Sequence, residues 1–228
     1  MKNCVILTTT SNQEGLEYYS FNDKKFDIII IDYTSENEGI TYPSNDIKVI
    51  FESNGGYKYK NIKKCIETLD ILEKYDYIWL PDWDVRISNE SVNKLFMLAE
   101  QFNLDLCQPS LSSDSHMSWS ITEYKPDSVV RLTNFVEVMC PLFKSSFLKE
   151  VLWTFDLNYS SWGLDFLWCE IGKEKTIGII DSVIVKHERP ISSHEWILPN
   201  GKTAHQELEE LQKNYNLFLD PKVLKSLN

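Results

Sequence analysis

The chain has 228 residues, of which 43% are hydrophobic and 25% charged, and its formal net charge is −11. This length and composition are typical of one soluble α/β domain. The negative charge argues against a nucleic-acid partner, and no apolar stretch approaches the roughly 20 residues of a transmembrane segment. Peripheral membrane association is left open.

Cysteine usage and the N-terminus both point to a cytoplasmic protein. The cysteines are widely spaced, odd in number and form no Cys-x-x-Cys pair, so we expect reduced thiols in the core. The first apolar run, Cys4–Leu7, is far too short for a secretion signal. The five cysteines are Cys4, Cys65, Cys107, Cys140 and Cys169.

Strand and helix patterns alternate through the first half of the chain. Near-continuous β-branched and apolar runs predict buried strands, and apolar residues at helical spacing predict helices. In chain order we expect strands Asn3–Thr9, Phe26–Asp32 and Ile47–Phe51, a helix Tyr59–Lys74, a strand Tyr77–Leu80, a helix from Ser88 or Asn89 to Phe102, and a strand Leu104–Gln108. This alternation predicts an α/β fold with a mostly parallel central sheet flanked by helices.

The second half is less regular. Residues 110–131 are polar, and we expect loops and an edge hairpin there. The later expected elements are a strand Phe135–Phe143, a helix from Ser145 or Ser146 to Trp153, a turn Ser160–Gly163, a helix Leu164–Glu170, strands Ile177–Ile180 and Val183–Lys186, and a helix Ala204–Tyr215.

Asp82 and Asp84 follow the expected strand Tyr77–Leu80, separated by one residue. Ligands of open α/β sheets bind at the carboxyl ends of the strands. Paired carboxylates there are oxygen ligands suited to Mg²⁺ or Mn²⁺, and such a metal also contacts substrate phosphates. The pattern therefore indicates transfer chemistry on a diphosphate, whereas the alternative is a solvated turn rich in aspartate.

Two later segments carry further polar groups. Asp165 opens a helix after a Trp162-Gly163 turn, where a carboxylate serves either as a general base or as a capping acid. Trp162 suits stacking on a sugar ring or plain packing. His187 ends a strand, and histidine is a common metal ligand, although a lone histidine more often has a structural role. We assign no role to His194 or His205.

These motifs and their order resemble the metal-dependent glycosyltransferases of the GT-A fold. More narrowly, they resemble the family labelled "lysine ketoglutarate reductase trans-splicing related". The resemblance covers roughly residues 75–190 and rests on the segments 75–84, 105–110, 135–143, 161–165 and 177–187.

The resemblance implies roles for individual residues. Asp84 and His187 would bind Mn²⁺ or Mg²⁺, Asp82 would contact the donor or the metal, and Asp165 would be the catalytic base. On the acceptor side it implies Trp162, Gly163 and Glu137, although a buried structural carboxylate is an equal alternative for Glu137. By likeness to the clan alone, the donor-binding residues would also include Thr8, Thr9, Asp32, Gly56 and Lys58.

The resulting hypothesis is one glycosyltransferase-like domain over residues 1–228. Residues 1–108 would form the nucleotide-binding half, 109–190 the acceptor and catalytic half, and 191–228 a tail with a helix. The enzyme would move a sugar from a nucleotide-diphosphate donor, with a UDP-sugar expected, to a hydroxyl of a saccharide acceptor. The transfer would be inverting, and its biological setting would be surface polysaccharide synthesis.

Three alternatives remain open. The first is a non-catalytic carbohydrate- or nucleotide-binding module on the same fold. The second is a glycosidase that uses Asp84 and Asp165 as its two carboxylates. The third is a nucleotidyltransferase, which uses similar metal-binding carboxylates.

Overall fold

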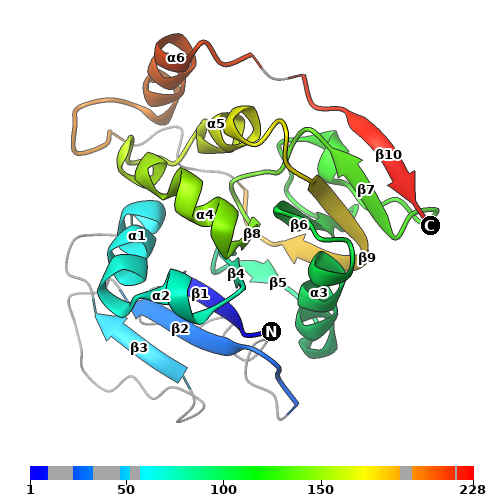
Figure 1. The fold of residues 1–228 in the computed structure, drawn as a ribbon. Helices are drawn as coiled ribbons and strands as arrows, with labels where there is room; N and C mark the ends of the chain where they lie inside the picture. Colours follow the sequence, from blue (N-terminus) through cyan, green and yellow to red (C-terminus); the bar gives the residue numbers. More distant parts are fainter. Residues whose placement is uncertain (10–22, 33–46, 52–56, 191–196, 219) are drawn as a thin grey trace.

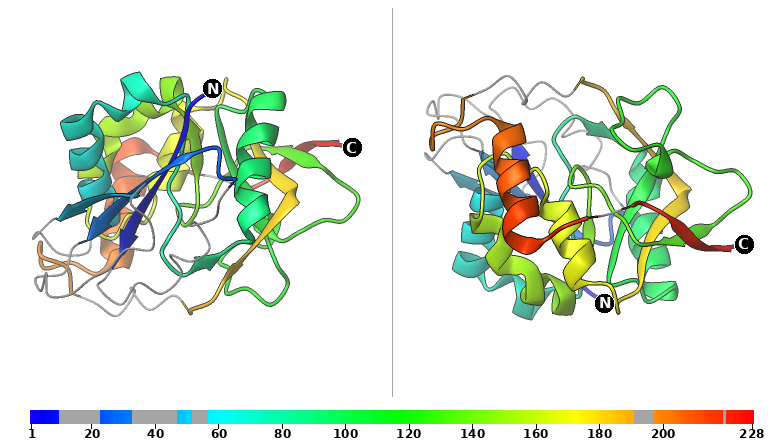
Figure 2. Two further views of the ribbon diagram at one scale, coloured as in Figure 1. Left: turned by 90° about the horizontal axis from the view of Figure 1, so that it is seen from below. Right: turned by 90° about the horizontal axis from the view of Figure 1, so that it is seen from above.

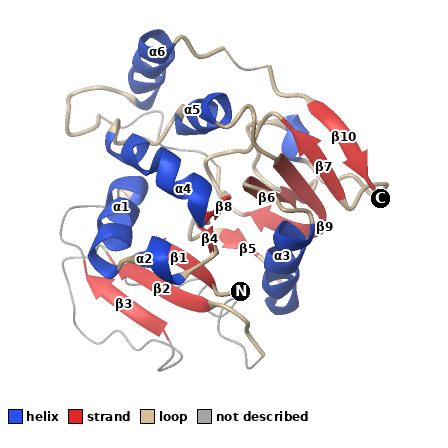
Figure 3. Ribbon diagram, in the orientation of Figure 1, coloured by secondary structure: helices blue, strands red, loops and turns tan. Residues whose placement is uncertain are grey.

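A central sheet runs through the protein, with helices packed on both of its faces (Figures 1 and 3). The computed structural model describes residues 1–9, 23–32, 47–51, 57–190, 197–218 and 220–228. The mixed α/β architecture expected from the sequence is confirmed.

The first half of the chain forms the parallel part of the sheet. β1 (Asn3–Thr9), β2 (Asp27–Asp32), β3 (Ile47–Phe51) and β4 (Tyr77–Trp79) lie in the order β4-β1-β2-β3, and every neighbouring pair is parallel. Parallel strands buried on both faces need apolar side chains at successive positions, and Ile28–Ile31 supply them. The sequence predicts a mostly parallel central sheet, and the described pairs among these four strands are all parallel.

Alternate side chains of these strands enter two separate cores. Ile29 and Ile31 join a cluster with α1 (Lys58–Leu69), α2 (Ile71–Lys74), α4 (Ser145–Val151) and α5 (Leu164–Ile171). Ile28 and Ile30 join a second cluster, into which α3 (Asn89–Gln101) packs. Figure 2 shows the resulting layers, with α3 on one side of the sheet and α1 and α4 on the other.

Beyond β4 the sheet is mixed. It continues from β4 through β8, β6, β9 and β7 to β10, and β5 pairs with β9 off this path. β6 and β9 are parallel, whereas the other pairs of this half are antiparallel. The bounds are β5 Val85–Arg86, β6 Leu106–Leu111, β7 Val130–Thr133, β8 Leu142–Lys144, β9 Ile177–His187 and β10 Val223–Leu227.

Several expected elements differ from the structure. The single helix Tyr59–Lys74 is wrong, because Asp70 adopts a left-handed backbone with φ of 52° and separates α1 from α2. The two strands expected on either side of Asp181 are one strand, β9, which continues through that residue while its register with β6 shifts. The edge strand β10 was not expected.

The strand expected over Phe135–Phe143 is also wrong. Only Leu142–Lys144 is a strand, and residues 135–141 cross the carboxyl end of the sheet as irregular backbone. Buried backbone groups still need partners, and side chains satisfy several of them here. Gln108 accepts a hydrogen bond from the Glu137 amide at 2.6 Å, and Tyr59 donates to the Val138 carbonyl at 2.6 Å.

The C-terminal helix α6 (Ala204–Tyr215) has the bounds that the sequence predicts. Thr203 and Gln206 form a reciprocal capping box, which explains why the helix begins there. All five cysteines are buried thiols, as expected. In the part of the chain that the structure describes, no helix has the length and apolar character needed to cross a bilayer.

A buried ion pair ties β7 to β9. The Arg131 guanidinium donates to both carboxylate oxygens of Asp181, at 2.7 and 2.9 Å, and also to the carbonyls of Ile121 and Glu123. The two charged side chains are only 4% and 0% exposed. Removing one partner of such a pair leaves a buried charge without compensation.

We predict that Arg131→Met destabilises the protein by about 3–5 kcal/mol, because it leaves the Asp181 carboxylate buried without its positively charged partner. Urea denaturation measures this loss. The control is Lys149→Met, whose partner Glu73 lies 3.4 Å away with both side chains at least 70% exposed, so little change is expected. Equal losses in the two variants would contradict a structural role for the buried pair.

Candidate active site

A pocket of about 680 Å³ lies beyond the carboxyl ends of β1 and β4. It is the place where an open α/β sheet binds its ligands. The structure brings together on its wall most of the residues singled out from the sequence: Thr8, Lys58, Asp82, Asp84, Glu137, Trp162, Gly163, Asp165 and His187.

The turn after β4 holds Asp82 and Asp84 at the pocket. The Asp82 amide donates to the Met139 carbonyl at 2.9 Å, and the Val85 amide donates back to the Asp82 carbonyl at 3.2 Å. Trp79, at the end of β4, donates its indole N–H to the Cys140 carbonyl at 3.0 Å. The turn is therefore fixed to the irregular segment 135–141.

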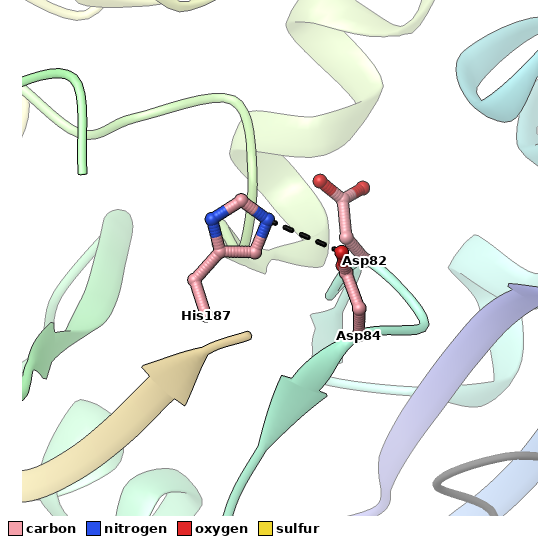
Figure 4. A group of neighbouring side chains, drawn as sticks. All are labelled: Asp82, Asp84 and His187. Carbon is pink, nitrogen blue, oxygen red and sulfur yellow. Dashed lines mark ion pairs between the residues drawn. The ribbon is translucent and has the colours of Figure 1, made fainter. Parts of the chain in front are cut away.

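The short pairing of β5 with β9 brings the second aspartate to the histidine. Val85 lies opposite His187 in this antiparallel pair, so Asp84, one residue earlier, reaches the imidazole. His187 Nε2 lies 3.4 Å from Asp84 Oδ2. Figure 4 shows the imidazole facing Asp84, with the Asp82 carboxylate beside it.

A backbone carbonyl determines how His187 presents its ring. Nδ1 lies 2.7 Å from the His116 carbonyl oxygen, which can only accept, so Nδ1 carries a proton. Nε2 is consequently the nitrogen that faces the aspartates. Ligand histidines in metalloproteins are commonly oriented in this way through the nitrogen that does not bind the metal.

The charges of this cluster shift one another's pKa values. Burial alone would raise the pKa of Asp84, but the hydrogen bond and charge of His187 outweigh it and hold the pKa below its usual range. Burial would lower the pKa of His187, whereas Asp84 and the His116 carbonyl raise it to about 9. Loss of solvent raises the pKa of Asp82, and Lys58 opposes that rise.

Asp82, Asp84 and His187 form a donor set that fits a divalent cation. One ligand atom from each lies within 4.8 Å of the others. Two carboxylates and one imidazole suit Mn²⁺, and the carboxylates also suit Mg²⁺. Three protein ligands leave coordination positions for substrate oxygens.

Lys58 neutralises the first aspartate. Its Nζ lies 2.7 Å from Asp82 Oδ1 and also donates to the Met139 carbonyl at 2.9 Å. Lys58 is the first residue of α1, and it joins the turn of Asp82 and Asp84 to segment 135–141. A cation at this position would also attract a phosphate group.

Asp165 enters the same pocket from the first turn of α5. Gly163, the N-cap, has φ of 85°, and a Cβ there would lie 2.8 Å from Leu208 of α6, so this turn needs glycine. The amides of Phe166 and Val138 donate to Asp165 Oδ1 and Oδ2 at 2.9 and 3.2 Å. Burial raises the pKa of Asp165 to about 6, although these two bonds oppose the rise.

The C-terminal helix supports the turn that carries Asp165. The Glu207 carboxylate is 3% exposed and accepts hydrogen bonds from the amides of Tyr159 and Ser160 at 2.8–3.1 Å. The His205 ring packs edge-on against Trp162, with centroids 4.9 Å apart. His205, to which the sequence assigned no role, thus orients an aromatic wall of the pocket; His194 lies outside the described residues.

Three predicted donor residues are not placed at the pocket. Asp32 is fully buried at the end of β2 and does not line it. Thr9 ends β1, and Gly56 lies outside the described residues. Their roles stay predictions.

Several pocket residues were missed by the sequence reasoning. They come from loop 116–119, from turn 159–161, from α5 and from α6, and no strand-end pattern marks them. Their one shared signal was the aromatic character of Trp119, Tyr159 and Phe166. The missed residues include Ser118, Trp119, Tyr159, Phe166 and Leu208.

Solved structures with a similar fold include glycosyltransferases of the GT-A clan. TarS 1–349 from S. aureus matches with a TM-score of 0.63 and 12% identity, over 96% of this chain and 67% of its own. The same protein in complex with UDP-GlcNAc matches with a TM-score of 0.62 and 13% identity, over 96% and 68%. GalNAc-T7 with UDP, GalNAc and Mn²⁺ matches with a TM-score of 0.67 and 9% identity, over 93% of this chain and 48% of its own.

The protein thus spans about two thirds of TarS 1–349 and about half of the GalNAc-T7 chain, and these identities establish the fold alone. No curated protein sequence matches it. The narrower label inferred from the sequence stays a prediction. Residues 16–134, just over half of the chain, match the family described as "Protein of unknown function (DUF707)", and the chain belongs to that family.

Proposed function

We propose that the protein is a metal-dependent glycosyltransferase, which moves a sugar from a nucleotide-diphosphate donor to a saccharide hydroxyl with inversion at the anomeric carbon. The observation that carries the proposal is the convergence of Asp82, Asp84 and His187 beside Asp165 in one pocket of a GT-A fold. A metal site alone would fit many enzymes. A buried carboxylate in the same pocket, Asp165, adds the group that an inverting transfer needs.

Asp84 and His187 would be the main metal ligands, with Asp82 as a third. The lowered pKa keeps Asp84 ionised, and the fixed Nδ1 proton leaves Nε2 for the metal. Because the pKa of His187 is raised to about 9, metal binding at neutral pH would release a proton. When bound, Mn²⁺ or Mg²⁺ neutralises the negative charge of the leaving diphosphate.

The remaining residues would position the donor and the acceptor. Lys58, whose Nζ lies 2.7 Å from Asp82, would attract a phosphate group of the donor. Thr8 lines the same pocket. Asp165 would accept the proton of the attacking hydroxyl. Trp162 would pack on a saccharide ring. Exclusion of water and alignment of the two substrates would supply a large share of the rate.

A uridine nucleotide is the donor that we propose. TarS has been solved with UDP and with UDP-GlcNAc, and GalNAc-T7 with UDP. For the present chain, a UDP-sugar donor and a role in surface polysaccharide synthesis are extensions from the fold.

We predict that UDP with Mn²⁺ raises the thermal midpoint of the wild-type protein and that Asp84→Asn abolishes the shift. At about 100 times the dissociation constant, a ligand adds about 2.7 kcal/mol of stability, which corresponds to roughly 5–10 °C here. Differential scanning fluorimetry measures it, with EDTA and with other nucleoside diphosphates as controls.

The matched control is Asp114→Asn, because Asp114 is an exposed aspartate that pairs with Lys186 and does not line the pocket. It should keep the full shift. A shift that survives Asp84→Asn, or that needs no metal, would remove the metal site from the proposal. Binding without release of sugar to water or to an acceptor would favour a binding module.

We predict that the transfer rate falls as the pH drops through about 6. A base works only when ionised, and Asp165 has its pKa raised to about 6, so the rate should be level above that pH and fall about tenfold per pH unit below it. The measurement is kcat/KM for the acceptor against pH at saturating Mn²⁺ and UDP-sugar, because this ratio reports the pKa of the base before the acceptor binds.

Asp165→Asn tests the same assignment independently. It should lower kcat by about 10²–10⁴-fold and leave the binding of UDP with Mn²⁺ in place. Transfer at near wild-type rate in Asp165→Asn would show that another group is the base.

A further inference from the structure

One carboxylate oxygen in the pocket has no partner. Glu137 is 5% exposed, and its Oε2 makes no hydrogen bond with any described residue. A buried polar atom in this state is costly unless something satisfies it. Among the described residues, the other two buried side-chain atoms of this kind belong to Asn3 and Ser128, which do not line the pocket.

Hydrogen bonds hold the backbone in place at Glu137 and at the residue after it. Its own amide donates to the buried Gln108 side chain at 2.6 Å. The next residue, Val138, donates its amide to Asp165 at 3.2 Å and accepts from the Tyr59 hydroxyl at 2.6 Å. The glutamate is therefore held in the pocket wall beside the proposed base.

Other buried carboxylates of the protein are satisfied, and the contrast is informative. Glu207 accepts hydrogen bonds from two backbone amides and from Asn200. Asp181 is paired with Arg131, and both oxygens of Asp165 accept backbone amides. A buried carboxylate with only a structural role is expected to have partners of this kind for its oxygens. Oε2 of Glu137 has none among the described residues, so it is available to a ligand.

The surroundings favour a hydroxyl group as that ligand. Burial, followed by the charge of Asp165, raises the pKa of Glu137 to about 7, so both protonation states occur near neutral pH. A hydroxyl can donate to the ionised form and accept from the protonated form. The aromatic side chains of Trp119, Trp162 and Phe166 line the same pocket and suit the apolar face of a sugar ring.

We propose that Glu137 is a specificity-determining residue, whose Oε2 hydrogen-bonds a hydroxyl of the saccharide that enters the pocket next to Asp165. The proposal rests on the proposed function. The hydroxyl belongs either to the sugar of the donor or to the acceptor, and the experiments separate these two sources.

The first experiment needs no ligand. Thermal unfolding at pH 8 compares wild type with Glu137→Gln and with Glu207→Gln, a matched change at a satisfied buried glutamate. Glu137→Gln should unfold at the wild-type temperature or above, because it removes a buried charge that is hydrogen-bonded to Ser118 but whose Oε2 has no described partner. Glu207→Gln should unfold several degrees lower. A loss in Glu137→Gln equal to that in Glu207→Gln would make Glu137 a structural residue and overturn the proposal.

The second experiment titrates wild type and Glu137→Gln, in Mn²⁺, with UDP and with a panel of UDP-sugars that includes UDP-GlcNAc. UDP affinity should be unchanged. About tenfold weaker binding of the preferred UDP-sugar alone would place the hydroxyl on the donor. Unchanged UDP-sugar binding with about tenfold higher KM for a saccharide would place it on the acceptor.

If neither the UDP-sugar affinity nor the KM for the saccharide changes, the proposal is wrong although the glycosyltransferase function stands. If wild type binds no nucleotide with Mn²⁺, the proposed function fails instead. The two failures are therefore distinguishable, and the unfolding comparison still reports whether Glu137 is structural.

Discussion

Negative charge converges on the carboxyl end of the sheet, and the other features of the site compensate for it. Asp82, Asp84, Glu137 and Asp165 all line one pocket, whereas the cations that the described residues place there are Lys58 and His187. Lys58 pairs with Asp82 and His187 with Asp84. Bringing carboxylates together and burying them costs free energy, and a divalent metal with a substrate would recover much of that cost.

The backbone around the pocket is adapted to hold these charges. Segment 135–141 is irregular backbone and not a strand, and its amides at residues 137 and 138 donate to the side chains of Gln108 and Asp165. The brief β5–β9 pairing brings residues about a hundred positions apart into one candidate metal-binding group. Glu207 holds the turn before Asp165 from the other side. Sites with such networks are rigid, so they can present ligand atoms in a fixed geometry.

The local sequence pattern was sufficient to predict the parallel strands, α6 and the polar residues at strand ends. Burial on two faces and helical periodicity leave clear signatures in a sequence. The pattern was insufficient where distant contacts override propensity. Segment 135–141 is as apolar as a strand but serves as the pocket wall. The support from α6 left no motif, since its partners are backbone amides. Asp82, Asp84, Asp165 and His187, which the structure brings to one pocket, could be singled out because chemistry restricts the residue types that bind metals and accept protons.

The central claim is that Asp84 and His187 hold a metal that also contacts the donor diphosphate. Pulsed electron paramagnetic resonance of Mn²⁺ bound to the protein with UDP tests it most directly. The account predicts a ¹⁴N coupling from an imidazole, absent in His187→Ala, together with a ³¹P coupling from the nucleotide. A spectrum of Mn²⁺ with couplings to water protons alone, in the presence of saturating UDP, would contradict it.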